Sequence, residues 1–141
     1  MKYAKDRKIT SSHTAEVLIE AFPWIKNATG KTVLIKYGGA AMVDPALRHA
    51  VMSDIVMLKI MGVNPVIVHG GGTFAGQLAE RLGIPRKMID GRRVTDRETL
   101  EVTVMVYAGW INKTLVARLQ ALGVNACGLS GCDLNLVKAD R

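Results

Sequence analysis

The chain has 141 residues, 49% of them apolar and 22% charged, so it can bury a core and does not have the composition of a disordered protein. Nineteen Lys and Arg against twelve Asp and Glu give a net charge of +7, but the basic residues are scattered and aromatic residues make up only 5%, which argues against nucleic-acid binding. No apolar run approaches the roughly 20 residues of a membrane span, which argues against a membrane protein.

The first 30 residues predict a polar tail and one helix. Residues 14–27 carry apolar side chains at helical spacing, with Pro23 expected to bend or weaken the helix. Gly30 ends the segment. The next stretch, TVLIKY at 32–37, is rich in β-branched residues and predicts a buried parallel strand followed by Gly38 and Gly39.

A second helix is predicted to begin at Asp44, an N-cap residue, with Pro45 at the first helical position. The residues expected to face the core are Leu47, Val51, Ile55 and Leu58. A second strand at 66–69 leads into three consecutive glycines. The helix after them has its apolar face at Phe74, Leu78 and Leu82.

The remaining third of the chain continues the alternation of helices and strands. Residues 84–94 predict a loop or a short hairpin, and Thr95 with Glu98 predicts a capping box. A long helix follows at 97–122, bent at Gly109, and further strands are expected at 125–129 and 135–139. Strands that alternate with helices predict an α/β fold, a three-layer sandwich with a mainly parallel sheet.

Glycines follow each of the first three predicted strands, at Gly38-Gly39, at 70–72 and at Gly131. In a parallel sheet these corners share the carboxyl edge, where bare amides at helix starts attract anions. The simpler interpretation is a set of tight turns. Three glycine corners at one edge favour an anion site over that interpretation. Lys36 sharpens the anion-site prediction, because a lysine ending an apolar strand needs either an anion or a route to solvent.

Other polar residues leave alternatives open. Either Arg92 or Arg93 could grip a carboxylate with two hydrogen bonds, or remain a solvated surface residue. His69 could act as a general base, although a core histidine bonded to the backbone is the more common case. Gly70-x-Gly72-x-x-Ala75 with Asp90 also fits a dinucleotide-binding pattern, whereas a Walker A loop is absent.

The cysteines and the N-terminus indicate the compartment. Cys127 and Cys132 match neither a CxxC metal pattern nor a disulfide framework, so we predict no metal site and a reducing environment. The polar N-terminus lacks the apolar segment of a signal peptide. The expectation is therefore a cytoplasmic protein.

Five motifs in register resemble the N-acetylglutamate kinases of the amino-acid kinase family over about residues 14–141. They are IKYGGAAM at 35–42, NPVIVHGGG at 64–72, DGRRVTDRETLEV at 90–102, INKTL at 111–115 and GLSG at 128–131. The resemblance implies the amino-acid kinase (carbamate kinase-like) fold. It also implies phosphoryl transfer from ATP, accompanied by Mg²⁺, to the side-chain carboxylate of N-acetyl-L-glutamate in arginine biosynthesis.

The resemblance also implies a role for each matching residue. Lys36 matches the lysine that stabilises the transition state, and Gly38 and Gly39 match the glycines beside the transferring phosphate. Gly71 and Gly72 match positions whose amides hold the acyl substrate. Arg93, rather than Arg92, matches the arginine that binds the α-carboxylate. Departures from the family pattern occur at Ala40, Thr73, Trp110, Cys132 and Leu134.

The resemblance further divides the chain into two parts. Residues 1–30 match an extension that joins dimers into hexamers in arginine-inhibited members, and Phe22 and Trp24 would suit such a partner surface. Residues 31–141 match the acyl-amino-acid-binding part, and the nucleotide-binding half is absent. We therefore expect an oligomer that is inactive alone, or alternatively a non-catalytic binding or assembly module, or less plausibly a dinucleotide-binding domain.

Overall fold

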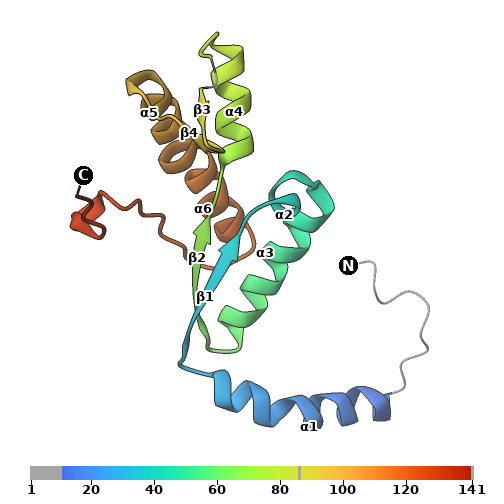
Figure 1. The fold of residues 1–141 in the computed structure, drawn as a ribbon. Coiled ribbons are helices and arrows are strands. Elements are labelled where there is room, and N and C mark those ends of the chain that lie inside the picture. Colours follow the sequence, from blue (N-terminus) through green and yellow to red (C-terminus); the bar gives the residue numbers. More distant parts are fainter. Residues whose placement is uncertain (1–10, 86, 141) are drawn as a thin grey trace.

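The computed structural model describes residues 11–85 and 87–140, except for the side chains of Arg92 and Arg93. Most of the predicted N-terminal tail lies outside these residues. The elements in chain order are α1 (Ser11–Ala28), β1 (Thr32–Tyr37), α2 (Ala40–Val43), α3 (Pro45–Ile60), β2 (Asn64–His69), α4 (Gly72–Arg81), β3 (Met88–Ile89), β4 (Arg92–Arg93), α5 (Arg97–Val104), the π-helical segment Met105–Ile111 and α6 (Asn112–Ala121) (Figure 1).

The centre of the fold is the parallel pair β1–β2, in which Thr32 is opposite Asn64 and Tyr37 is opposite His69. Helices α3 and α6 pack against one face of this pair, and the alternating side chains of the strands divide accordingly. The buried cluster consists of Tyr37, Met42, Met52, Ile55, Val56, Ala75, Ala79, Val102, Val106, Ile111, Leu115 and Leu119. The opposite face of the pair is open and carries Leu34, Lys36, Val66 and Val68.

The predicted α/β class with a parallel sheet is confirmed, but two strand predictions are wrong. Residues 124–130 form no strand, and 135–139 contains only the end of a short 3₁₀ turn, Asp133–Asn135. The backbone of 124–130 bonds to side chains of α6, with Asn112 Nδ2 donating to Leu129 O (3.2 Å) and Lys113 Nζ to Gly128 O (3.1 Å). These contacts satisfy the carbonyls of two consecutive residues outside any strand ladder.

Helix α3 begins as predicted. Asp44 Oδ1 accepts hydrogen bonds from Ala46 N (2.8 Å) and Leu47 N (2.9 Å), which caps the first turn. Its buried face is centred on Met52, Ile55 and Val56, so the prediction that Leu47 faces the core is wrong. Leu47 lies in the first turn, at the end of the helix where solvent reaches it. Leu82 is likewise exposed, and Ala75 and Ala79 form the buried face of α4.

The long helix predicted for 97–122 is present as α5, the π-helical segment and α6 in unbroken succession. Gly109, where a bend was expected, lies inside this π-helical segment, whose turns are wider than those of an α-helix. The predicted capping box is wrong by one residue. Asp96 is the N-cap, and its carboxylate accepts a hydrogen bond from Thr99 N (3.1 Å).

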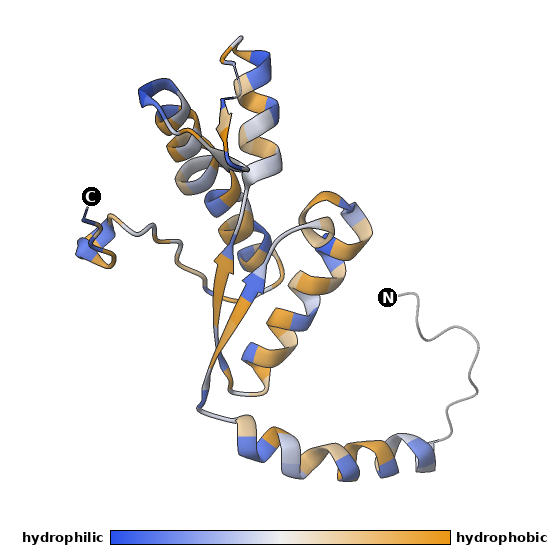
Figure 2. Cartoon of the chain, viewed as in Figure 1, coloured by the Kyte–Doolittle hydropathy of each residue, from blue (hydrophilic) through white to orange (hydrophobic). Residues whose placement is uncertain are grey.

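Helix α1 lies apart from the rest of the molecule and buries none of its residues (Figure 1). Hydrophobic and hydrophilic residues are mixed along it, and Ile19, Phe22 and Trp24 are largely exposed (Figure 2). Its junction with β1 is fixed, because Thr29 Oγ1 donates to Met61 O (3.1 Å) and Gly30 N to Gly62 O (2.8 Å). Within the described residues, no helix combines the length and apolar character needed to traverse a bilayer.

Candidate anion-binding site

The two glycine corners that follow β1 and β2 lie side by side. The strands end in register at Tyr37 and His69. Beyond this pair, Gly70 N donates a 3.0 Å hydrogen bond to Tyr37 O and links the ends of the two strands. The carboxyl ends of both strands therefore form one rim, as the sequence predicted (Figure 1).

The first corner requires glycine for its backbone conformation. Gly39 has φ of +60° and ψ of −140°, a region that side chains disfavour, and it stands at the N-terminus of α2 without any side-chain cap. Space around Gly38 and Gly39 is open, since a Cβ at either position would meet no atom within 4 Å. The backbone here is accessible to a ligand.

The second corner requires glycine because another element is close. A Cβ on Gly71 would lie 2.6 Å from Ile111 Cδ1 and 3.1 Å from Tyr107 Cε2, both in the π-helical segment. Gly71 is also the N-terminal residue before α4 and has no side-chain cap, so the first amides of that helix are not covered by a capping side chain. Packing thus accounts for glycine at position 71, whereas a Cβ on Gly70 would meet no atom within 4 Å.

Lys36 lies on the open face of the sheet, one residue before the end of β1 and opposite Val68. Its ammonium takes part in none of the hydrogen bonds or ion pairs found among the described residues. The backbone of Lys36 thus places a positive charge at the strand end next to the rim, where the ammonium can bind an anion or extend into solvent.

His69 fits the structural interpretation better than a catalytic one. The ring is half-buried, and Nδ1 lies 3.0 Å from Gly70 O, where an Nδ1–H donates to the backbone. Tyr37, its neighbour across the strands, is buried and donates to Ala41 O (2.9 Å). Burial raises the pKa of Tyr37, although the positive charges of Arg48 and Arg118 oppose that effect.

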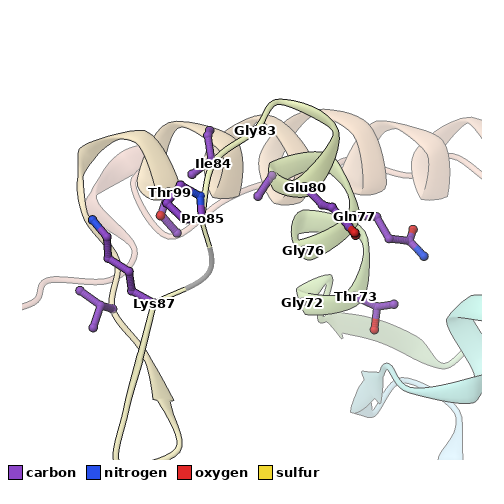
Figure 3. Close-up of a pocket in the computed structure, with 12 residues that line it drawn as sticks. Gly72, Thr73, Gly76, Gln77, Glu80, Gly83, Ile84, Pro85, Lys87 and Thr99 are labelled. Carbon is purple, nitrogen blue, oxygen red and sulfur yellow. The ribbon is translucent and has the colours of Figure 1, made fainter.

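A cavity of about 700 Å³ opens beside the rim, between α4 on one side and residues 83–85, Lys87 and α5 on the other (Figure 3). This size suits a small-molecule ligand. Gly72 contributes to its wall. Its polar lining consists of Thr73, Gln77, Glu80, Lys87 and Thr99. Of these, the sequence analysis had named only Thr73, and only as a departure from the family pattern.

An ion pair fixes the outer wall of this cavity. Lys87 Nζ lies 3.0 Å from Asp96 Oδ2, and Asp96 also caps α5. Hydrogen bonds from Thr99 and Lys87 hold the pKa of Asp96 at about 2. The loop that carries Lys87 is thereby tied to the start of α5. The capping pattern at 96–99 was the one sequence signal that could have located this wall.

The hairpin β3–β4 is the short hairpin that the sequence allowed, with Ile89 paired to Arg92 and Met88 to Arg93. The side chains of Arg92 and Arg93 lie outside the described part of the chain, so the predicted role of Arg93 stays a prediction. Asp90 occupies the hairpin turn with φ of +48°. In a dinucleotide-binding domain, the Asp or Glu that binds the ribose lies at the end of a neighbouring parallel strand. The position of Asp90 in a hairpin turn therefore argues against the dinucleotide interpretation.

The third predicted corner does not join the rim. Residues 124–130 run past β2 and away from the strand ends, so Gly131 lies in the separate C-terminal segment (Figure 1). Ser130 and Asp133 form a closed local turn instead, in which Ser130 Oγ donates to Asp133 Oδ2 (2.7 Å) and Val137 N to Gly131 O (2.9 Å). The expectation of three corners at one edge is therefore wrong for the third.

The fold and the rim define an α/β protein with two glycine corners at one strand edge, and similarity identifies its family. The profile of the amino acid kinase family matches residues 31–141, so the chain belongs to that family. The acetylglutamate kinase of Thermoanaerobacter pseudethanolicus is 52% identical over 127 residues, covering 90% of this chain and 42% of that protein. The acetylglutamate kinase of Alcanivorax borkumensis is 51% identical over 132 residues, covering 93% and 44%.

Solved structures agree with the fold. The structure of smu.665 from Streptococcus mutans UA159 has a TM-score of 0.61 and 30% identity, covering 71% of this chain and 40% of that one. N-acetylglutamate synthase from Neisseria gonorrhoeae, in complex with coenzyme A and L-arginine, has a TM-score of 0.58 and 26% identity, covering 82% and 26%. The chain spans less than half the length of the acetylglutamate kinases that it matches.

Proposed function

We propose that residues 31–141 form the acyl-amino-acid-binding part of an N-acetylglutamate kinase, which transfers a phosphoryl group from ATP to the side-chain carboxylate of N-acetyl-L-glutamate in arginine biosynthesis. The observation that supports this most directly is Lys36, which has no partner among the described residues and stands beside two glycine corners that a single backbone hydrogen bond joins. The identity of about 50% to acetylglutamate kinases supports the choice of substrate.

In the proposed reaction, a carboxylate oxygen of the substrate attacks the terminal phosphorus of ATP. A new O–P bond forms, the P–O bond to ADP breaks, and ADP leaves with that electron pair. Little covalent chemistry falls to the protein, so its contribution is positioning and charge neutralisation. Lys36 would offset the negative charge on the transferring group, and the amides of Gly38 and Gly39 would lie beside it.

Substrate binding falls to the second corner and the hairpin. The amides of Gly71 and Gly72 would donate hydrogen bonds to the acyl substrate, and the neighbouring cavity offers it room. Arg93 would bind the α-carboxylate through two parallel hydrogen bonds. In the described residues no group of three or more His, Cys, Asp or Glu could hold a metal ion, so we assign no ligand for the Mg²⁺ that accompanies ATP.

The nucleotide site belongs, in this proposal, to a part of the enzyme beyond the matched region. A second candidate, which the catalytic test below separates from the first, is a non-catalytic module that binds acyl-glutamate. We further propose that the cytoplasmic protein assembles through residues 1–30, since Phe22 and Trp24 of α1 are exposed, and that arginine feedback acts through this assembly. Removal of residues 1–28, followed by light scattering, should lower the oligomeric state; an unchanged mass would overturn this part.

Binding is tested by calorimetry of the whole chain with N-acetyl-L-glutamate. Arg93→Met should weaken binding about tenfold or more, because a charge-assisted hydrogen bond to the α-carboxylate is lost. Arg92→Met is the matched control and should leave the Kd within about twofold. Equal effects of the two substitutions would contradict the assignment of Arg93.

Catalysis is tested by an ATP-dependent hydroxamate assay. The chain alone should give no product, whereas mixing it with the separately expressed carboxyl-terminal part of the Thermoanaerobacter pseudethanolicus kinase should restore turnover. Lys36→Met should abolish that turnover while leaving N-acetyl-L-glutamate binding within a few fold. Turnover that survives Lys36→Met would contradict the role of the lysine, and binding without restored turnover would favour the non-catalytic module.

A further inference from the structure

A second, smaller cavity lies on the helical side of β1, away from the open face that carries Lys36. Its volume is about 70 Å³, enough for roughly two water molecules or the head group of a small acid. The residues that line it are Tyr37, Met42, Arg48, Phe74, Trp110, Ile111, Thr114, Leu115 and Arg118. It shares none of Lys36, Gly38, Gly39, Gly71 and Gly72 with the rim described above.

Two guanidinium groups line this cavity, and no carboxylate among the described residues lines it with them. Neither Arg48 nor Arg118 takes part in the ion pairs found in the described part of the chain. Arg48 Nε is moreover buried without a hydrogen-bond partner. An unpaired donor on a buried charged group costs free energy that a bound oxyanion would recover.

The phenol of Tyr37 lies within the electrostatic influence of both arginines. Their positive charges both lower the pKa of its phenol, against the larger effect of burial. The hydroxyl cannot serve as the missing anion, because it is held as a donor to Ala41 O at 2.9 Å. The positive charge of the cavity is therefore not neutralised by its own lining.

The remaining wall is aromatic. The rings of Phe74 and Trp110 meet edge to face, with centroids 5.8 Å apart and planes inclined at 72°. Trp110 is still 52% exposed, so one side of the indole remains available beyond the mouth of the cavity. Such a surface favours a flat apolar group stacked on it or against its edge.

We propose that this cavity binds a small carboxylic acid with a flat apolar body. The carboxylate enters the cavity between Arg48 and Arg118 and accepts hydrogen bonds from their guanidinium groups, including Arg48 Nε. The apolar body does not fit inside 70 Å³ and lies along the exposed side of Trp110. Because Met42 and Phe74 also line the cavity, the ligand contacts α2 and α4, the helices that follow the two glycine corners.

The probe for this site is sodium benzoate, added at constant ionic strength to the whole chain. Binding is followed through the indole N–H signal of Trp110 in ¹H–¹⁵N spectra, assigned with Trp110→Phe. Benzoate should shift this signal saturably, and benzamide, which has the same shape without the charge, should bind about tenfold more weakly or less. Equal affinities for benzoate and benzamide would overturn the proposal.

Variants separate the arginines from general effects of charge. Arg118→Met should weaken benzoate binding about tenfold, and because Arg118 is exposed on α6 this variant should fold even if Arg48→Met does not. Arg81→Met, on an exposed residue at the end of α4, is the control with the same loss of charge and should bind as the unmodified chain does. Benzoate binding that survives Arg118→Met, or inorganic phosphate that binds as tightly as benzoate, would contradict the proposed site.

Discussion

Replacement of Gly71 by alanine tests the close packing of the second glycine corner. The new Cβ would lie 2.6 Å from Ile111 Cδ1 and 3.1 Å from Tyr107 Cε2. The φ of Gly71 is 173°, outside the left-handed range that favours glycine, so we assign the cost to packing. Overpacking of a core typically costs about 1–3 kcal/mol. At a urea dependence of about 2 kcal/mol per M, the unfolding midpoint should fall by about 0.5–1.5 M.

Two controls make the test specific. Gly70→Ala adds the same methyl group one residue earlier, where no atom lies within 4 Å, and should leave the urea midpoint nearly unchanged. Ile111→Val removes the colliding Cδ1 atom and costs about 0.5–1.5 kcal/mol by itself, but it should recover part of the loss in the double variant. If Gly71→Ala is as stable as Gly70→Ala, or if its cost is independent of residue 111, the packing argument is refuted.

Three further substitutions test individual hydrogen bonds. Asp44→Ala should lower the free energy of unfolding in urea by about 1 kcal/mol through loss of the α3 cap; a cost no larger than that of Asp54→Ala, within the same helix, would refute this. The pKa of Asp96 is about 2 against 3.8, so its stabilisation is present above pH 4 and is lost as the pH falls towards 2. Asp96→Asn should therefore flatten the acid limb of stability between pH 4 and 2, and an unchanged limb would count against the pairing. Tyr37→Phe should cost about 1 kcal/mol in the same urea assay by leaving Ala41 O unpaired. Because the pKa of Tyr37 is raised, the variant should also lose the part of the tyrosine absorbance change that occurs at high pH.

The sequence by itself determined the elements whose signals are local. The run of β-branched residues at Thr32–Tyr37 fixed β1 to the residue, because alternation and β propensity act on neighbours in the chain. Asp44 followed by proline located the start of α3, and Gly109, where a bend was expected, lies within the π-helical segment that separates α5 from α6. The strand-end Lys36 and the two glycine corners were predictable for the same reason.

Only the tertiary structure decided which of these features meet. Residues 124–130 form no strand, and two of their carbonyls bond to Asn112 and Lys113 of α6, contacts that no local pattern records. The reason for glycine at position 71 lies in Ile111, forty residues further along the chain. The two cavities described above likewise arise from the mutual placement of helices. Each is lined by residues from several segments of the chain, so no single segment of sequence predicts its burial or its charge.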